Sequence, residues 1–200
     1  QGLDTAQVVV TDGGRQQEIR LPEGTITMTA EQQGDEYELT FTCQGMLPEL
    51  PRLGIVMALP DDYNRVEWYG LGPWDNYPDR QAACTIGKWT STVAEQYTPY
   101  ARPQDSGSHG SCAYVALRNG TGKTIRVEAI GEPFAFSALP YSARELATKN
   151  HHYELRPDGH TYLSIDCAVL GLGNSSCGPG VLKRYAIDKS TTHRLRFRIR

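Results

Sequence analysis

Residues 67–80 read EWYGLGPWDNYPDR, and this stretch is the most informative part of the chain about its fold. It begins with the pattern of a β-strand, and the Gly-Leu-Gly-Pro segment at 70–73 predicts a turn into a loop. Four large aromatic side chains stand beside an asparagine, two aspartates and an arginine. Aromatic faces next to planar hydrogen-bonding groups suit sugar binding, but aromatic residues also fill hydrophobic cores, so the run by itself leaves both roles open.

The whole chain has 200 residues, 39% of them hydrophobic, which is typical of one globular domain with a substantial core. A net charge of −3 and a pI near 6.0 argue against nucleic acid or an anionic membrane as a partner. No segment reads as a membrane-spanning helix or a signal peptide. The first residue is Gln1 rather than Met, which indicates a processed product or a piece of a longer protein. We expect a soluble protein of the cytoplasm or the periplasm.

Cysteines and histidines favour no metal or redox site. The five cysteines, at positions 43, 84, 112, 167 and 177, are odd in number and form no C-x-x-C pair, so free thiols are expected ahead of disulfides. His151 and His152 are adjacent and would point to opposite faces of a strand, and His109 and His160 fall in separate polar loops. We therefore expect no metal and no cofactor in this chain.

Hydrophobic and polar residues alternate along most of the chain, which is the period of a half-buried β-strand. The last strand shows this most clearly, because Leu195, Phe197 and Ile199 alternate with four arginines. Those arginines predict a solvated face or contact with an acidic neighbouring surface. Trp68 lies at an alternating position and is expected in the core. The pattern predicts a single all-β domain over residues 1–200, an antiparallel β-sandwich with strands around 26–30, 37–43, 53–59, 66–68, 125–129, 163–169 and 195–199.

Turn signals lie between these strands. Asp-Gly-Gly at 12–14, Asn-Gly-Thr-Gly at 119–122 and Asp-Gly at 158–159 each predict a hairpin. One short helix is expected from Ser142 to Thr148, with Ser142 as N-cap and Glu145 closing a capping box. Two long loops, about 98–110 and 171–180, lack periodicity, and long ordered loops in compact β-domains are often functional.

Several motifs of the chain occur in one order between residues 51 and 200. They resemble, in that order, the C-terminal small-chain domain (domain 5) of glycoside hydrolase family 2 β-galactosidases, which is similar to the galactose-mutarotase supersandwich. An Arg-x-Pro-x-Asp-Asn-Asp motif that usually opens this domain does not occur in residues 1–50. The resemblance thus implies a sandwich that lacks its first strands. The motifs are Pro-Arg-Leu-Gly (51–54), the run 67–80, Tyr-Thr-Pro-Tyr (97–100), Pro-Gln-Asp-Ser-Gly (103–107), Phe-Ala-Phe-Ser (134–137), Tyr-Ser (141–142), Glu-Leu (145–146) and His-His-Tyr-Glu-Leu (151–155).

The same resemblance implies that the catalytic residues lie elsewhere. Retaining glycosidases use two carboxylates about 5 Å apart, and in this family both are glutamates on a separate (β/α)8 barrel. No part of this sequence alternates strands and helices as such a barrel does. His151 and Glu154 could be the acid and base of a mutarotase, but their stretch is better interpreted as a packing motif. We expect no catalytic residue here and no hydrolysis by this chain alone.

Substrate contact is predicted mainly for the loop at 171–180. Some family members carry a Trp there that forms a platform for the sugar, and Cys177 takes that position when the loop is aligned on Pro179. The substrate-binding candidates are Asn174, Ser175, Ser176 and Cys177, followed by Trp74 and Asn76 in the run 67–80. Asp79 and Arg80 are expected to stabilise their loop by an ion pair or hydrogen bonds, and Asn76 to cap the turn.

The implied function is that of an accessory domain of a β-galactosidase, an enzyme that hydrolyses terminal β-D-galactosides. The domain would buttress the catalytic barrel and line the galactoside pocket. Its partners would be that barrel, the other domains of the enzyme, the galactoside and a second copy in a homo-oligomer. Two alternatives stay open: a freestanding carbohydrate-binding module, and a purely structural domain without ligand contact.

Overall fold

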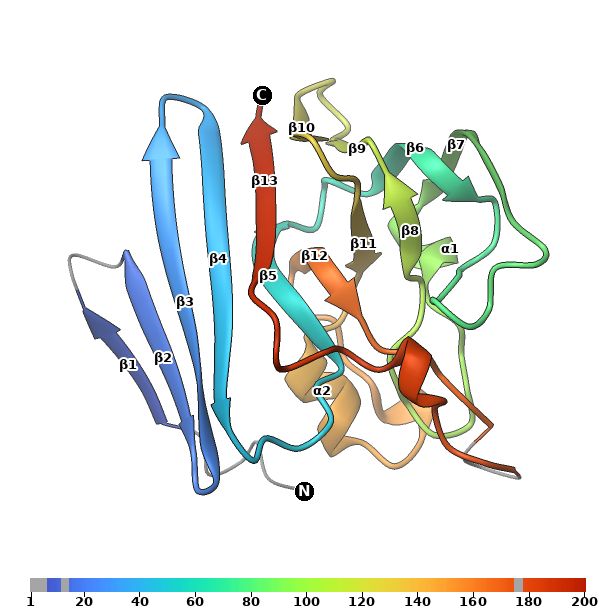
Figure 1. Cartoon of the computed structure of the whole chain (residues 1–200). Helices are drawn as coiled ribbons and strands as arrows, with labels where there is room; N and C mark the ends of the chain where they lie inside the picture. Colours follow the sequence, from blue (N-terminus) through green and yellow to red (C-terminus); the bar gives the residue numbers. More distant parts are fainter. Residues whose placement is uncertain (1–6, 12–14, 175–177) are drawn as a thin grey trace.

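The computed structural model describes residues 7–11, 15–174 and 178–200, whose strands form two antiparallel sheets (Figure 1). The larger sheet has nine strands in the order β1-β2-β3-β4-β13-β10-β9-β6-β7, and the smaller has four in the order β5-β12-β11-β8. The predicted antiparallel β-sandwich is therefore confirmed. The bounds are β1 Gln7–Thr11, β2 Gln16–Leu21, β3 Gly24–Gln33, β4 Glu36–Gly45, β5 Arg52–Pro60, β6 Arg65–Gly72, β7 Thr85–Thr92, β8 His109–Cys112, β9 Tyr114–Arg118, β10 Thr124–Ala129, β11 Phe134–Leu139, β12 His160–Val169 and β13 His193–Ile199.

The core lies between the two sheets and is built from the alternating residues. Trp68 is only 1% exposed, as predicted, and its ring centroid lies 5.7 Å from that of Phe136 in the opposite sheet. Its indole nitrogen donates a hydrogen bond to the carbonyl of Leu71 at 3.1 Å, so the polar end of the ring is satisfied. His109 is also buried, in β8 rather than in the polar loop that we expected, and burial lowers its pKa to about 4.

The arginine-rich strand β13 lies between β4 and β10, near the middle of the nine-stranded sheet (Figure 1). Leu195 and Phe197 are buried in the core. Both predicted surroundings of the arginines occur, because Arg194, Arg196 and Arg200 are exposed, and Arg196 and Arg198 pair with Glu38 and Glu36 of β4. Opposite charges directly across two strands stabilise this register.

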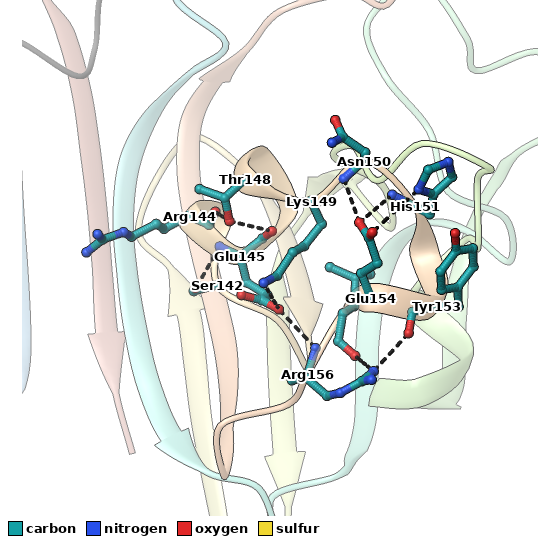
Figure 2. A network of polar contacts seen from close by, with 11 residues as sticks. Ser142, Arg144, Glu145, Thr148, Lys149, Asn150, His151, Tyr153, Glu154 and Arg156 are labelled. Atoms are coloured by element: carbon teal, nitrogen blue, oxygen red, sulfur yellow. Dashed lines mark hydrogen bonds and ion pairs between the residues drawn. The ribbon is translucent and has the colours of Figure 1, made fainter.

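The predicted helix is α2 (Ala143–Thr148), and Ser142 caps it by accepting a hydrogen bond from the amide of Glu145. The predicted capping box is wrong in its second half, because the Glu145 carboxylate accepts from the amide of Arg156 at 2.9 Å (Figure 2). A second helix, α1 (Val93–Gln96), was not predicted. It is a single turn and too short to show helical periodicity. Two 3-10 turns, η3 (His152–Glu154) and η4 (Lys183–Tyr185), complete the helical elements of the described ranges.

The predicted hairpins have mixed outcomes. The segment 119–122 does connect β9 and β10, with the Asn119 amide donating to Lys123 at 3.0 Å. The hairpin at 158–159 is wrong, because this dipeptide leads from the helical region into β12, and β12 pairs with β5 and β11. Neither β5 nor β11 directly precedes or follows β12 through this dipeptide. The residues 158–159 therefore have the composition of a turn, but they do not connect two paired strands. The segment 12–14 lies outside the described residues, between the paired strands β1 and β2.

Candidate functional site

The run 67–80 continues in strand β6 through Gly72 before it enters a loop, so the turn predicted at 70–73 begins later than expected. A Cβ atom at Gly72 would lie 2.6 Å from the Trp89 ring, so the strand can pass that indole only with glycine there. The side chains before this point alternate between the core and the outer face of the sheet. The residues after Pro73 form the loop that carries the site candidates Trp74 and Asn76.

Those two candidates have opposite environments. The Trp74 side chain is exposed, with 67% of its surface accessible, and its ring is free to contact another molecule. Asn76 is 1% exposed. Its amide nitrogen donates to the carbonyls of Leu71 and Trp74 at 3.4 and 3.2 Å, and its amide oxygen accepts from the amide of Gly110 at 2.8 Å. Asn76 therefore fixes the loop, as predicted for a turn cap, and both of its amide hydrogens are already used.

Asp79 joins this run to the loop at 171–180. Its two carboxylate oxygens accept hydrogen bonds from the amides of Leu172 and Gly173, at 2.9 and 2.7 Å. A Cβ atom on Gly171 would lie 2.7 Å from the Asp79 carboxyl carbon, so glycine is required for this approach. We expected Asp79 to stabilise its own loop, whereas it holds a second loop 93 residues further along the chain.

Arg80 does not pair with Asp79 in the described structure. Its pKa is raised, mainly by a side-chain hydrogen bond with Tyr100. The predicted Asp79–Arg80 ion pair is therefore absent among the described residues, and Asp79 uses its carboxylate for the loop at 171–173 instead. Asp79 thereby connects the run 67–80 with a segment that is remote in sequence.

The loop at 171–180 is described at its two ends. The Asn174 side chain is exposed, and its backbone amide donates to the carbonyl of Pro179 at 2.9 Å, which closes the loop at its base. Gly173 has a φ of +59°, a conformation that glycine adopts without strain. Ser175, Ser176 and Cys177 lie outside the described residues. The structure thus brings the base of the predicted loop next to the run 67–80, and contact of either segment with a sugar stays a prediction.

A cavity of about 340 Å³ lies between the run 67–80, the end of strand β12 and the segment 184–188, and no described residue of the loop at 171–180 lines it. The run contributes Asn76, Tyr77 and Pro78 to its lining, and the segment after the loop contributes Arg184, Tyr185 and Asp188. The Arg184 guanidinium lies 4.8 Å from the centre of the Tyr185 ring. The cavity thus has an aromatic ring and charged groups on one side, while most of its lining is apolar.

A polar network that the sequence analysis did not predict contacts the run 67–80 through Tyr77. Arg52 donates to Asp105 at 2.6 Å, to Asp166 at 3.2 Å and to Ser137 at 3.1 Å. The hydroxyl of Tyr77 donates to the same Asp105 oxygen at 3.4 Å. Arg52 and Asp105 belong to two of the motifs that carry the family resemblance. The sequence signal for their partner, Asp166, was a single charged residue within an apolar strand.

Burial in this network determines the protonation of the Asp166 carboxyl group. Asp166 is 2% exposed, and desolvation raises its pKa to about 6, although Arg52 and Ser164 counteract the shift. A carboxyl group that is enclosed so deeply needs the nearby guanidinium to stay charged. The network therefore ties β5, β12 and the loop at Asp105 to the run through Tyr77.

The His151–Glu154 pair is a cap and not part of this site. The Glu154 carboxylate accepts from the amides of Asn150 and His151, each at 3.0 Å, and lies 3.6 Å from the His151 ring (Figure 2). Both side chains are exposed. Backbone hydrogen bonds lower the pKa of Glu154, so it is fully ionised at neutral pH. These contacts explain the motif by local structure, in agreement with the packing interpretation.

Within residues 7–11, 15–174 and 178–200, no group of three or more His, Cys, Asp and Glu side chains could hold a metal ion. Cys43, Cys84, Cys112 and Cys167 are free thiols. No helix in the described ranges is both long and apolar enough to cross a membrane.

Comparison with known proteins agrees with the motif resemblance. The chain is 35% identical over 144 residues to the β-galactosidase of Actinobacillus pleuropneumoniae, which covers 72% of this chain and 14% of that protein. The β-galactosidases of Staphylococcus xylosus and Photobacterium profundum are 32% and 34% identical, and each match covers 82% of this chain and 16% of the relative. A solved structure of a candidate aldose 1-epimerase from Escherichia coli K12 aligns with a TM-score of 0.41 and 10% identity, covering 98% of this chain and 68% of that one.

The family match covers nearly the whole chain. It extends over residues 4–199 and therefore includes the first fifty residues, where the individual motifs showed no resemblance. The chain spans only about one sixth of the length of the β-galactosidases that it matches. With the antiparallel sandwich, the motif order and this match in agreement, the chain belongs to the β-galactosidase small-chain family.

Proposed function

We propose that this chain is a non-catalytic part of a β-galactosidase that buttresses the catalytic barrel and lines one wall of the galactoside pocket. The observation that carries the proposal is the pair of hydrogen bonds that the Asp79 carboxylate accepts from the amides of Leu172 and Gly173. They hold the base of the predicted substrate loop against the run that presents the exposed Trp74. The relatives are themselves β-galactosidases, and the chain matches only 14–16% of their length.

The chemistry of the two segments suits a sugar. Asn174, Ser175 and Ser176 carry an amide and two hydroxyl groups, which hydrogen-bond sugar hydroxyls, and the glycines around them allow close approach. Trp74 offers a broad aromatic face. Cys177 occupies the position where other members of the resembled family have a Trp platform, so this chain would rely on hydrogen bonds there and on Trp74 for stacking.

Hydrolysis in this proposal requires the rest of the enzyme. A retaining glycosidase needs two carboxylates about 5 Å apart on either side of the scissile bond. The expectation is therefore that the purified chain alone does not release the chromophore from a chromogenic β-galactoside, while the whole protein that contains it does. Hydrolysis by the chain alone would contradict the proposal.

The role of the loop is tested in the whole protein. Replacing Asn174–Cys177 with four glycines is expected to raise KM for a β-galactoside and to leave the folded state intact by circular dichroism. An unchanged KM would instead support the purely structural alternative. Calorimetry of the chain with galactose and lactose addresses the binding-module alternative, because millimolar or tighter binding without the rest of the enzyme would favour it.

A further inference from the structure

The outer face of the nine-stranded sheet, away from the core, carries a groove of about 640 Å³ across strands β7, β6, β9 and β10. Its floor is Ala116, a small side chain between much longer neighbours. Arg65 and Arg118 form one end, directly opposite each other in the paired strands β6 and β9. Because directly opposed residues of an antiparallel pair point to the same face, the two guanidinium groups share this end of the groove.

The carboxylates that line the groove are already engaged by other partners. Glu67 accepts from Tyr114 at 2.9 Å and pairs with Lys88 at 3.1 Å. Glu95 accepts from the amide and the hydroxyl of Thr92, each at 2.9 Å, in the capping box of α1. Glu67 is therefore paired with a cation, and Glu95 is the one carboxylate among the described lining residues of the groove without a cationic partner.

The third arginine of the groove is also engaged. Arg126 pairs with Glu128 at 2.6 Å and lies 3.5 Å from the centre of the Tyr114 ring. Arg65 and Arg118, by contrast, are exposed and form no ion pair with any residue that the structure describes. Like charges that face each other across a sheet destabilise it unless an anion lies between them. Two unpaired arginines against one unpaired carboxylate, Glu95, therefore give this groove a net positive charge.

Exposed hydrophobic groups continue the surface beyond the groove. Tyr69 is 44% exposed and stacks with Tyr114, with ring centroids 6.4 Å apart. Ile86 is 52% exposed on the neighbouring strand β7. Tyrosine and arginine are the residues enriched where proteins dock, and an apolar ledge beside unpaired charges is typical of an interface. The surface therefore has the chemistry to receive a protein segment.

We propose that this groove docks an acidic segment from the rest of the β-galactosidase, with one carboxylate between Arg65 and Arg118 and a hydrophobic residue against Tyr69 and Ile86. The inference rests on the proposed function, since it assigns the partner to the same enzyme. Two observations favour that partner. The first is the net positive charge of the groove. The second is that 86% and 84% of the length of two β-galactosidase relatives lies outside their match to this chain, since the matches cover 14% and 16% of them.

The test uses the whole protein that contains this chain, with Arg65→Lys and Arg118→Lys made separately. A carbodiimide joins an amine to a carboxylate only when the two are in direct contact, and mass spectrometry then identifies both partners. The expected result is an amide cross-link from position 65 or 118 to an Asp or Glu outside residues 1–200, which is lost at high salt because exposed ion pairs are screened. Arg20→Lys is the matched control, because Arg20 is exposed and pairs with Glu18 at 2.7 Å, so its cross-link should stay within the chain.

Two results would overturn the inference. One is a cross-link from Arg20→Lys to Glu18 with none from positions 65 and 118. The other is cross-links from those positions only to residues 1–200, in the same or a second copy. As a second measurement, R65E/R118E should lower the thermal midpoint of the whole protein at low ionic strength, and an unchanged midpoint would also contradict docking. Cross-linking does not depend on turnover, so failure of the proposed function would be recognised separately, by the absence of β-galactoside hydrolysis in the unmodified protein.

Discussion

Replacing Asp79 with alanine tests the link between the two segments of the candidate site. The carboxylate accepts two backbone amides, at 2.9 and 2.7 Å, and hydrogen bonds to a charged group contribute about 1.5–3 kcal/mol each when they are well made. Asp79 is half-buried, so the lower end of this range applies to each bond. We expect D79A to remove about 3 kcal/mol of the free energy that orders the loop.

The expected consequence in the whole enzyme is a higher KM. A loss of 1.4 kcal/mol in binding free energy corresponds to a factor of ten. If about half of the lost ordering energy reaches substrate binding, KM for a β-galactoside should rise roughly tenfold. The amides of Leu172 and Gly173 should at the same time lose protection in hydrogen–deuterium exchange, since their acceptor is gone. Steady-state kinetics and exchange mass spectrometry measure the two effects on the same sample.

Glu154→Ala is the matched control for this variant. Glu154 also accepts two backbone amides, each at 3.0 Å, but both belong to its own turn (Figure 2). E154A should therefore alter exchange only around η3 and leave KM unchanged. Full protection of Leu172 and Gly173 in D79A would refute the reasoning about the clamp. Lost protection with an unchanged KM would refute the placement of this loop at the substrate.

Three further predictions follow from burial and charge. Trp74→Ala should raise KM for a β-galactoside and change the free energy of unfolding by less than about 0.5 kcal/mol, because the side chain is 67% exposed; unchanged kinetics would remove Trp74 from the site. Trp68→Ala should destabilise the fold by about 3–5 kcal/mol in urea unfolding, because a ring that is 1% exposed leaves a cavity in the core, and a much smaller loss would contradict its central position. Burial raises the pKa of Asp166 from 3.8 to about 6, so the folded state binds its proton more tightly than the unfolded chain does. The stabilisation from this group is therefore complete below pH 4 and is lost as the pH rises through 6, and Asp166→Asn should flatten the stability profile in that window.

Much of the fold was predictable because its signals are local. A strand at 163–169 follows from alternation alone, and Ser142 caps a helix because its hydroxyl reaches an amide three residues away. The failures occur where a local signal has a distant partner. Asp158-Gly159 has the composition of a hairpin turn, yet the strand that follows it pairs with β5 and β11. Glu145 has the spacing of a capping box, yet its carboxylate bonds Arg156.

The sequence identified the candidate residues of the site, and the structure showed which of them contact one another and which are exposed. The exposed position of Trp74 beyond Pro73 followed from turn chemistry. That the side-chain oxygen of Asn76 is also engaged could not be predicted, because its donor, the amide of Gly110, lies 34 residues away. Asp166 was missed for the same reason, since its role depends on Arg52, which is 114 residues earlier.

The sequence by itself located seven of the thirteen described strands and identified the antiparallel sandwich and the family, because alternation and motif order are properties of neighbouring residues. The tertiary structure alone decided that Asp79 holds the loop at 171–173, and that Arg65 and Arg118 face each other on one sheet. These relations depend on strand order and register, which result from packing the whole core and leave no signature in either segment alone. The run 67–80 shows both: its residues identify the family, and its contacts with remote loops form the candidate site.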